Sequence, residues 1–112
     1  ENAFIAAMRL KCRARRIDAY VSAALRLVDA GEADTALWFA EVAADACPGR
    51  EDAAFALMRA QAASGQSVQA METYRLCAKH LAEELGIDPG DRMREMYCEL
   101  LNGKEPMQKS AE

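Results

Sequence analysis

The sequence predicts an all-helical protein built from antiparallel helical hairpins, with about five helices and a capping helix at the C-terminal end. Three observations support this prediction. The 112-residue chain is 52% hydrophobic and rich in alanine, the strongest helix former, with only three Phe, three Tyr and one Trp. Its three prolines leave long intervals free of helix breakers. When the sequence is shifted along itself by a fixed number of residues, one glycine turn and the small-residue helix after it align with a second such turn and helix.

The first helix is expected over residues 3–30, which contain neither proline nor glycine. Its apolar residues recur at helical spacing and predict one buried stripe, which comprises Leu10, Ala14, Ile17, Val21, Ala24 and Val28. A loop near residues 11–16 is the alternative to one continuous helix. Arg9, Arg13 and Arg16 share another face, which is either a solvated rim or a docking surface for an acidic partner.

Glycines then divide the chain into hairpins. Gly31 is expected to cap the first helix, and a second helix over about 33–46 is stopped by the Cys-Pro-Gly segment at 47–49. A third helix over 51–64 ends before Gly65, and a fourth over 68–85 ends before Gly86. Because the connections are short, consecutive helices are expected to be antiparallel.

The two hairpins have the same pattern. A 34-residue shift, hereafter the repeat period, places Gly31 on Gly65, Ala36 on Ala70, Leu37 on Met71 and Ala43 on Cys77. It equals the tetratricopeptide period, and small residues are needed where the second helix of a repeat crosses its neighbours. The second repeat has Tyr74 at the position that Ala40 holds in the first. Two repeats are few for such a stack, so terminal helices must act as caps.

The fifth helix is expected to provide the C-terminal cap. After Gly86, Asp88 is predicted as its N-cap and Pro89 as its first residue. Its apolar face would seal the last hairpin, through Met93, Met96, Tyr97, Leu100 and Leu101. We therefore expect one domain over residues 1–101 and a flexible polar tail over 102–112.

Charge and cysteine content restrict the possible functions. Residues 1–16 carry a local charge of +4 and the rest of the chain carries -8, so DNA is expected to be bound only through a domain absent from this chain. The four widely spaced cysteines are expected as small buried hydrophobes rather than disulfides or zinc ligands, at Cys12, Cys47, Cys77 and Cys98. No secretory signal or span of ~20 apolar residues is present, which predicts a cytoplasmic protein that does not enter a membrane. Because the chain starts at Glu1, we expect a piece of a longer protein.

The sequence contains no recognisable catalytic or cofactor motif. His80 is the single histidine and lies beside Lys79, and Glu83 and Glu84 point about 100° apart on a helix. We therefore expect no enzymatic activity, no cofactor and no metal. The methionines are expected mainly to fill the core.

Trp38 shares a helical face with three acids, Asp34, Glu41 and Asp45. An exposed tryptophan would be a contact anchor, whereas the alternative is that the first helix or an upstream neighbour covers it.

Three segments, 57–66, 69–75 and 81–90, resemble a known family in their order and content. The last reads Leu-Ala-Glu-Glu-Leu-Gly-Ile-Asp-Pro-Gly, and the whole resembles the bacterial transcriptional activator domain of SARP-type antibiotic regulatory proteins over roughly residues 9–101. The resemblance implies a tetratricopeptide-like module that follows a winged-helix DNA-binding domain in many members. It transfers no catalytic residue.

The leading hypothesis is a protein-interaction and regulatory module of a bacterial transcription regulator. It would support self-association, for example as a homodimer, or contact a DNA-binding domain or the transcription machinery. The candidate partner-binding residues are Arg9, Arg13, Arg16 and Trp38, and the residues assigned to the fold are Gly31, Ala36, Gly65, Ala70, Tyr74, Gly86, Asp88 and Pro89. The alternative is a tetratricopeptide-like adaptor or small-ligand sensor outside transcription.

Overall fold

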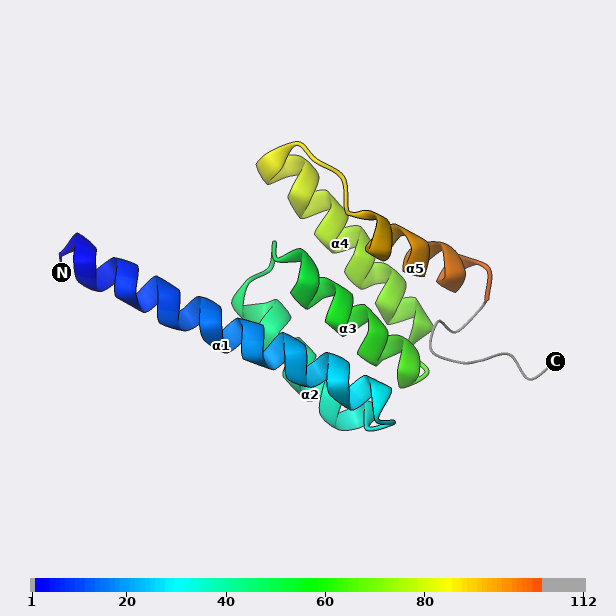
Figure 1. Cartoon of the computed structure of the whole chain (residues 1–112). Helices are drawn as coiled ribbons and strands as arrows, with labels where there is room; N and C mark the ends of the chain where they lie inside the picture. The colour runs from blue at the N-terminus through cyan, green and yellow to red at the C-terminus, as the bar shows by residue number, and fades with distance from the viewer. Residues whose placement is uncertain (1, 104–112) are drawn as a thin grey trace.

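The computed structural model describes residues 2–103, and over that range the chain is all-helical. The helices are α1 (Ala3–Asp29), α2 (Ala33–Ala46), α3 (Glu51–Ala63), α4 (Ser67–Leu85) and α5 (Asp91–Leu101). Figure 1 shows α3 between α1 and α4, with α5 along α4 and the N-terminal part of α1 projecting beyond the other helices. The predicted all-helical fold of tetratricopeptide-like hairpins is confirmed. Most of the expected tail, residues 104–112, lies outside the described residues.

Helix α1 is continuous, so the alternative of a loop near residues 11–16 is wrong. It begins where the Asn2 side chain accepts a hydrogen bond from the backbone N–H of Ile5 at 2.9 Å. The predicted buried stripe is correct for its last four members, Ile17, Val21, Ala24 and Val28. It is wrong for Leu10 and Ala14, which are exposed because this part of α1 projects past the end of α2.

The two hairpin turns have nearly the same geometry, as the sequence repeat predicts. Gly31 and Gly65 have φ values of 83° and 80°, in the left-handed region that glycine adopts without steric cost. The residue after each glycine donates a 2.8 Å backbone hydrogen bond back into the preceding helix, from Glu32 to Leu27 and from Gln66 to Gln61. Ala36 and Ala70 are both 0% exposed, so the repeat extends into the packing.

Two hydrophobic clusters meet at α3. One joins α3 to α1 and α2, and includes Ala53, Ala56 and Ala60. The other joins α3 to α4 and α5, and includes Met58 together with Met93. These two methionines are fully buried, as expected of core fillers, and α3 is consequently covered on two sides.

The connection from α4 to α5 follows the prediction at one end and departs from it at the other. Gly86 adopts the left-handed conformation at the end of α4 with φ 67°, as predicted. The predicted N-cap at Asp88 and helix start at Pro89 are wrong, because α5 begins at Asp91 with Gly90 as its N-cap. The Gly90 N–H donates to the carboxylate of Glu51 on α3, so a tertiary contact satisfies this donor, while Asp88 and Pro89 remain in the connecting segment.

Helix α5 seals the second cluster through ring contacts. Tyr97 stacks on Tyr74 of α4, with ring centroids 4.2 Å apart and an interplanar angle of 10°. The Arg92 guanidinium lies 4.0 Å from the ring centroid of Phe55 on α3. At the position where the first repeat has the small residue Ala40, the second repeat thus has Tyr74 and its stacked partner Tyr97.

Candidate interaction surface

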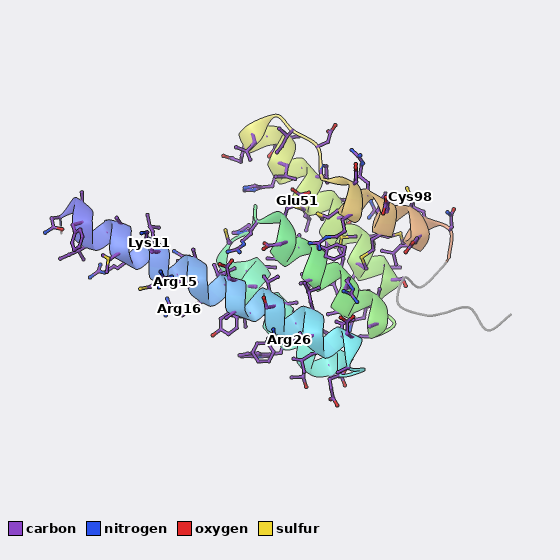
Figure 2. All side chains as sticks on the ribbon, in the orientation of Figure 1. Lys11, Arg15, Arg16, Arg26, Glu51 and Cys98 are labelled. Atoms are coloured by element: carbon purple, nitrogen blue, oxygen red, sulfur yellow. The ribbon has the colours of Figure 1, made fainter. Side chains whose placement is uncertain are left out.

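The projecting part of α1 has an exposed face that combines apolar and basic side chains. A shallow depression on this helix, hereafter the basic-apolar face, is lined by Phe4, Ile5, Met8, Arg9, Cys12, Arg13 and Arg16. Phe4 is 73% exposed and Met8 is 49% exposed, so Met8 departs from the expected role of core filler. Figure 2 shows the side chains of α1 along the projecting segment, where Lys11, Arg15 and Arg16 are labelled.

The structure brings the three predicted arginines onto this one face. Arg13 also donates from Nη2 to the backbone carbonyl of Ala46 at 3.2 Å, which ties α1 to the last residue of α2. Guanidinium groups are suited to bidentate contacts with carboxylates. An exposed ion pair contributes only about 0–1 kcal/mol, however, so the neighbouring apolar side chains must supply much of any binding energy. The partner-binding role of Arg9, Arg13 and Arg16 remains a prediction.

Trp38 lies on the exposed side of α2 with 56% of its surface open. It meets the ring of Tyr20 on α1 edge-on, with centroids 6.4 Å apart, and the ring of Phe39 at 5.0 Å. Helix α1 therefore borders the indole but does not cover it. Asp34, Glu41 and Asp45 lie on the same face of α2, which is therefore aromatic and acidic.

A second concave region, which no local motif signalled, runs between α2 and α4 with α3 beneath it. This groove has a volume of about 500 Å³ and is lined by side chains that include Asp45, Leu57, Leu76, Cys77, His80 and Glu83. His80 packs so closely on the α2–α3 connection that a Cβ at Gly49 would lie 2.5 Å from its Cδ2. His80 therefore contributes to the packing of α4 against this connection. The lining residues come from three helices, which explains why sequence spacing did not reveal the groove.

The cysteines do not all behave as expected. Cys77 is buried, and burial raises the pKa of its thiol, which lowers its thiolate fraction at neutral pH. Cys12 and Cys98 are exposed, which contradicts the prediction of buried cysteines: Cys12 lies on the projecting part of α1, and Cys98 lies beside the acids of α5. All four are free thiols.

Residues 2–103 contain no group of three or more His, Cys, Asp or Glu side chains placed to hold a metal ion. Within the same part of the chain, no helix is both long enough and apolar enough to cross a membrane.

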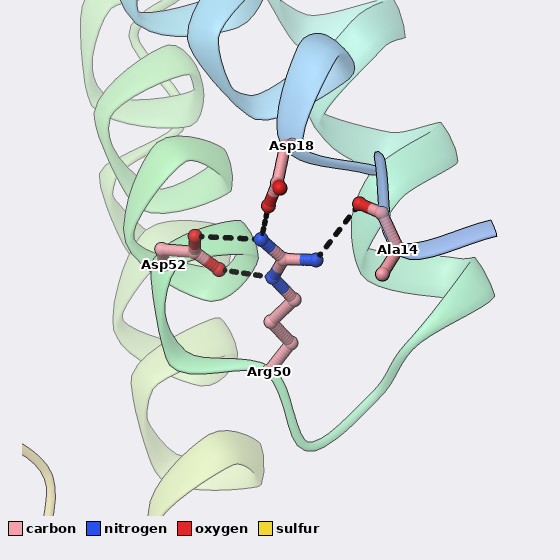
Figure 3. Close-up of polar contacts among 4 residues, drawn as sticks. All are labelled: Ala14, Asp18, Arg50 and Asp52. Carbon is pink, nitrogen blue, oxygen red and sulfur yellow. Dashed lines mark hydrogen bonds and ion pairs between the residues drawn. The ribbon is translucent and has the colours of Figure 1, made fainter. Parts of the chain in front are cut away.

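Sequence reasoning missed a polar contact between the two repeats, drawn in Figure 3. The Arg50 guanidinium binds the carboxylate of Asp52 with distances of 2.7 and 3.1 Å. It also donates to the Asp18 carboxylate and, at 3.5 Å, to the Ala14 carbonyl, both on α1. The sequence contains one feature that could have indicated this contact. An Arg-x-Asp sequence occurs at 16–18 and again, one repeat period later, at 50–52.

One of three comparisons with known proteins found a match. The sequence model of the family described as "Bacterial transcriptional activator domain" matches residues 1–101, a range that includes all five helices. Searches of curated proteins and of solved structures returned no match. The family match covers the two hairpins, the capping helix and the projecting part of α1, and it indicates a module of bacterial transcription activators. This chain belongs to the bacterial transcriptional activator domain family.

Proposed function

We propose that the domain acts as a protein-interaction and regulatory module of a bacterial transcription regulator, and that the basic-apolar face of α1 is its principal binding surface. The observation that supports this proposal most strongly is that α1 projects past its neighbours with apolar side chains uncovered. Contiguous exposed apolar patches commonly mark interaction sites. The partner would be another region of the regulator, a second copy of the chain or the transcription machinery in the cytoplasm.

The composition of this face suits protein recognition. Phe4, Ile5 and Met8 supply apolar area, and the three arginines favour a partner that carries carboxylates. Charge complementarity of this kind mainly sets orientation and association rate. Trp38 provides a further anchor on α2, where tryptophan is typical of residues that contribute most to an interface. The mechanism is surface complementarity and includes no bond-making step.

Transcription from a reporter tests the proposal. The chain is fused to a heterologous DNA-binding domain whose operator lies upstream of a weak bacterial promoter. The wild-type fusion should raise transcription above the DNA-binding domain alone. A triple variant with Arg9→Glu, Arg13→Glu and Arg16→Glu should return it to that baseline, because the face would then repel an acidic partner.

The matched control carries the same change in charge at exposed residues outside the basic-apolar face, as Lys11→Glu, Arg15→Glu and Lys79→Glu. It should retain reporter activity, and circular dichroism should give equal helicity for all three proteins. Full activity in the Arg9, Arg13 and Arg16 variant would reject the proposed face. Equal loss in the control would show that net charge, rather than this surface, determines the result.

A further inference from the structure

The exposed side of α2 combines an indole with carboxylates. Asp34, Trp38, Glu41 and Asp45 are all exposed and follow one another at intervals of four, three and four residues. This spacing places them in one column along the helix, about 16 Å long at a rise of 1.5 Å per residue. Helix α2 contains no basic residue. We call these four residues the acidic-aromatic column.

Neighbouring rings hold the indole of the column in place. Trp38 meets the rings of Tyr20 and Phe39 at interplanar angles of 87° and 85°. More than half of its surface is nevertheless open to solvent. Among aromatic side chains tryptophan attracts a cation most strongly, and a side chain that is already positioned loses less entropy on binding. The column therefore has a preformed contact for a cationic group.

The carboxylates of the column are available to a partner. Within residues 2–103, no hydrogen bond or ion pair engages the side chains of Asp34, Glu41 or Asp45. Each of these carboxylates accepts hydrogen bonds and can bind a guanidinium in bidentate fashion. A cationic partner would thus gain contacts without breaking any that the domain already makes.

The groove between α2 and α4 adds an apolar recess beside the column. Asp45 belongs to both, because it also lines the groove with Leu57 of α3 and Leu76 of α4. Leu76 is 60% exposed and Leu57 is half-buried, so apolar surface is open on two sides of the recess. Its volume of about 500 Å³ accommodates a large apolar side chain and the adjoining backbone.

The charge of this combined surface indicates the sign of its partner. The groove adds the carboxylate of Glu83 and the ammonium of Lys79 to the three carboxylates of the column. Four carboxylates and one ammonium give a net charge of -3, with His80 neutral. An acidic surface next to an apolar recess is complementary to a segment that carries several cations and one apolar side chain.

We propose that the acidic-aromatic column and the adjoining groove bind a linear basic segment of a protein. Its lysine and arginine side chains would lie along the column, and one apolar side chain would enter the groove between Leu57 and Leu76. About five residues of extended chain span the length of the column. An arginine fits best at Trp38, because a guanidinium stacks on an indole and also binds carboxylates.

This inference goes beyond the proposed function, because it assigns a second partner of opposite charge. The basic-apolar face of α1 suits a partner with carboxylates, whereas the column on α2 suits a partner with cations. Trp38 is thereby assigned to the second partner. The projecting part of α1 in a second copy is also basic, but it is helical and is tied to α2 through Arg13, so it does not provide a linear segment.

Synthetic peptides and the whole 112-residue chain test the proposal. The probe is a fluorescein-labelled peptide amide of sequence Arg-Lys-Leu-Lys-Arg, and binding is followed by fluorescence anisotropy. It should bind saturably, and added salt should weaken the binding. Replacing its leucine with serine should lower the affinity about tenfold, and replacing its four cations with glutamate should abolish binding. No saturation at about 1 mM chain, or equal binding of all three peptides, would overturn the proposal.

Neutral variants locate the binding surface. Removing the three charges of the column should lower the affinity for the leucine probe at least tenfold, in the variant Asp34→Asn, Glu41→Gln and Asp45→Asn. The matched control makes the same change in net charge at exposed acids outside the column and the groove, as Glu84→Gln, Glu95→Gln and Glu99→Gln. The control should retain binding, and circular dichroism should give equal helicity. An equal loss in both variants would overturn the assignment to α2.

Two single substitutions separate the indole from the groove. Trp38→Ala should lower the affinity for both the leucine and the serine peptide about tenfold. Leu76→Ala should lower the affinity for the leucine peptide about threefold and leave the serine peptide unchanged. Val68→Ala, at an exposed apolar residue of α4 outside the groove, should change neither affinity. Equal effects of Leu76→Ala on the two peptides would overturn the role of the groove.

The arginine variant of α1 distinguishes this inference from the proposed function. The protein with Arg9→Glu, Arg13→Glu and Arg16→Glu should bind the basic peptide at least as tightly as the wild type while it loses reporter activation. Weaker peptide binding would contradict two separate surfaces. Sedimentation of the unlabelled chain should show a monomer. A dimer that Trp38→Ala dissociates would assign the column to a second copy and overturn the proposal.

Discussion

Helices α1 and α3 are the same element of the repeat in two environments. Helix α3 lies between two hairpin layers and buries residues on both sides, whereas α1 buries one stripe and leaves the equivalent second face open. In repeat proteins each unit packs mainly against its nearest neighbours. A helix that has a neighbouring hairpin on only one side therefore leaves its other side exposed. The same helix of the repeat therefore buries two faces where a hairpin lies on each side of it and one face where a hairpin lies on one side only.

The largest expected effect comes from adding volume at equivalent positions on the two helices. Ala56→Leu should destabilise the domain by about 1–3 kcal/mol, because Ala56 is 0% exposed in the junction with α1 and α2. Ser22→Leu, one repeat period earlier, should change stability by less than about 0.5 kcal/mol because the site is exposed. Urea denaturation followed by circular dichroism measures both. Similar losses for the two variants would mean that the second face of α1 is already covered.

A smaller effect is expected from replacing either of two arginines that lie one repeat period apart, Arg16 and Arg50. Arg50→Ala should cost about 1 kcal/mol, since it removes the contacts to Asp18, Asp52 and the Ala14 carbonyl from a partly buried site. Arg16→Ala should cost less than about 0.5 kcal/mol because Arg16 lies in the exposed part of α1. Thermal unfolding of the two variants at equal ionic strength provides the comparison. A larger cost at Arg16 than at Arg50 would contradict the exposed position of Arg16 on α1.

Features encoded locally could be predicted from the sequence. The glycine turns at Gly31, Gly65 and Gly86 need positive φ, and the recurrence of small residues fixes where the second helix of each hairpin crosses its neighbours. The family resemblance also depended on contiguous segments. These features explain why the hairpins and their register were predictable.

Features set by distant residues could not be predicted in this way. Asp88 is not the N-cap because Glu51, far away in the sequence, binds the Gly90 N–H. Leu10 is exposed because α2 ends at Ala46, and no property of α1 itself determines that end. Helical spacing alone predicted that Arg9, Arg13 and Arg16 share one face. The open face of α1 with small residues became apparent only when its exposure was compared with the packing of α3.

Hydrogen exchange of the unmodified 112-residue chain tests the central difference between the two helices most directly. Amides in residues 3–16 of α1 should exchange orders of magnitude faster than those in α3, because the projecting segment opens without disturbing either hydrophobic cluster. Residues 17–28 should have intermediate protection from their single buried stripe. Slow exchange along all of α1, equal to that of α3, would contradict the account, since it would mean that both faces of α1 are already packed.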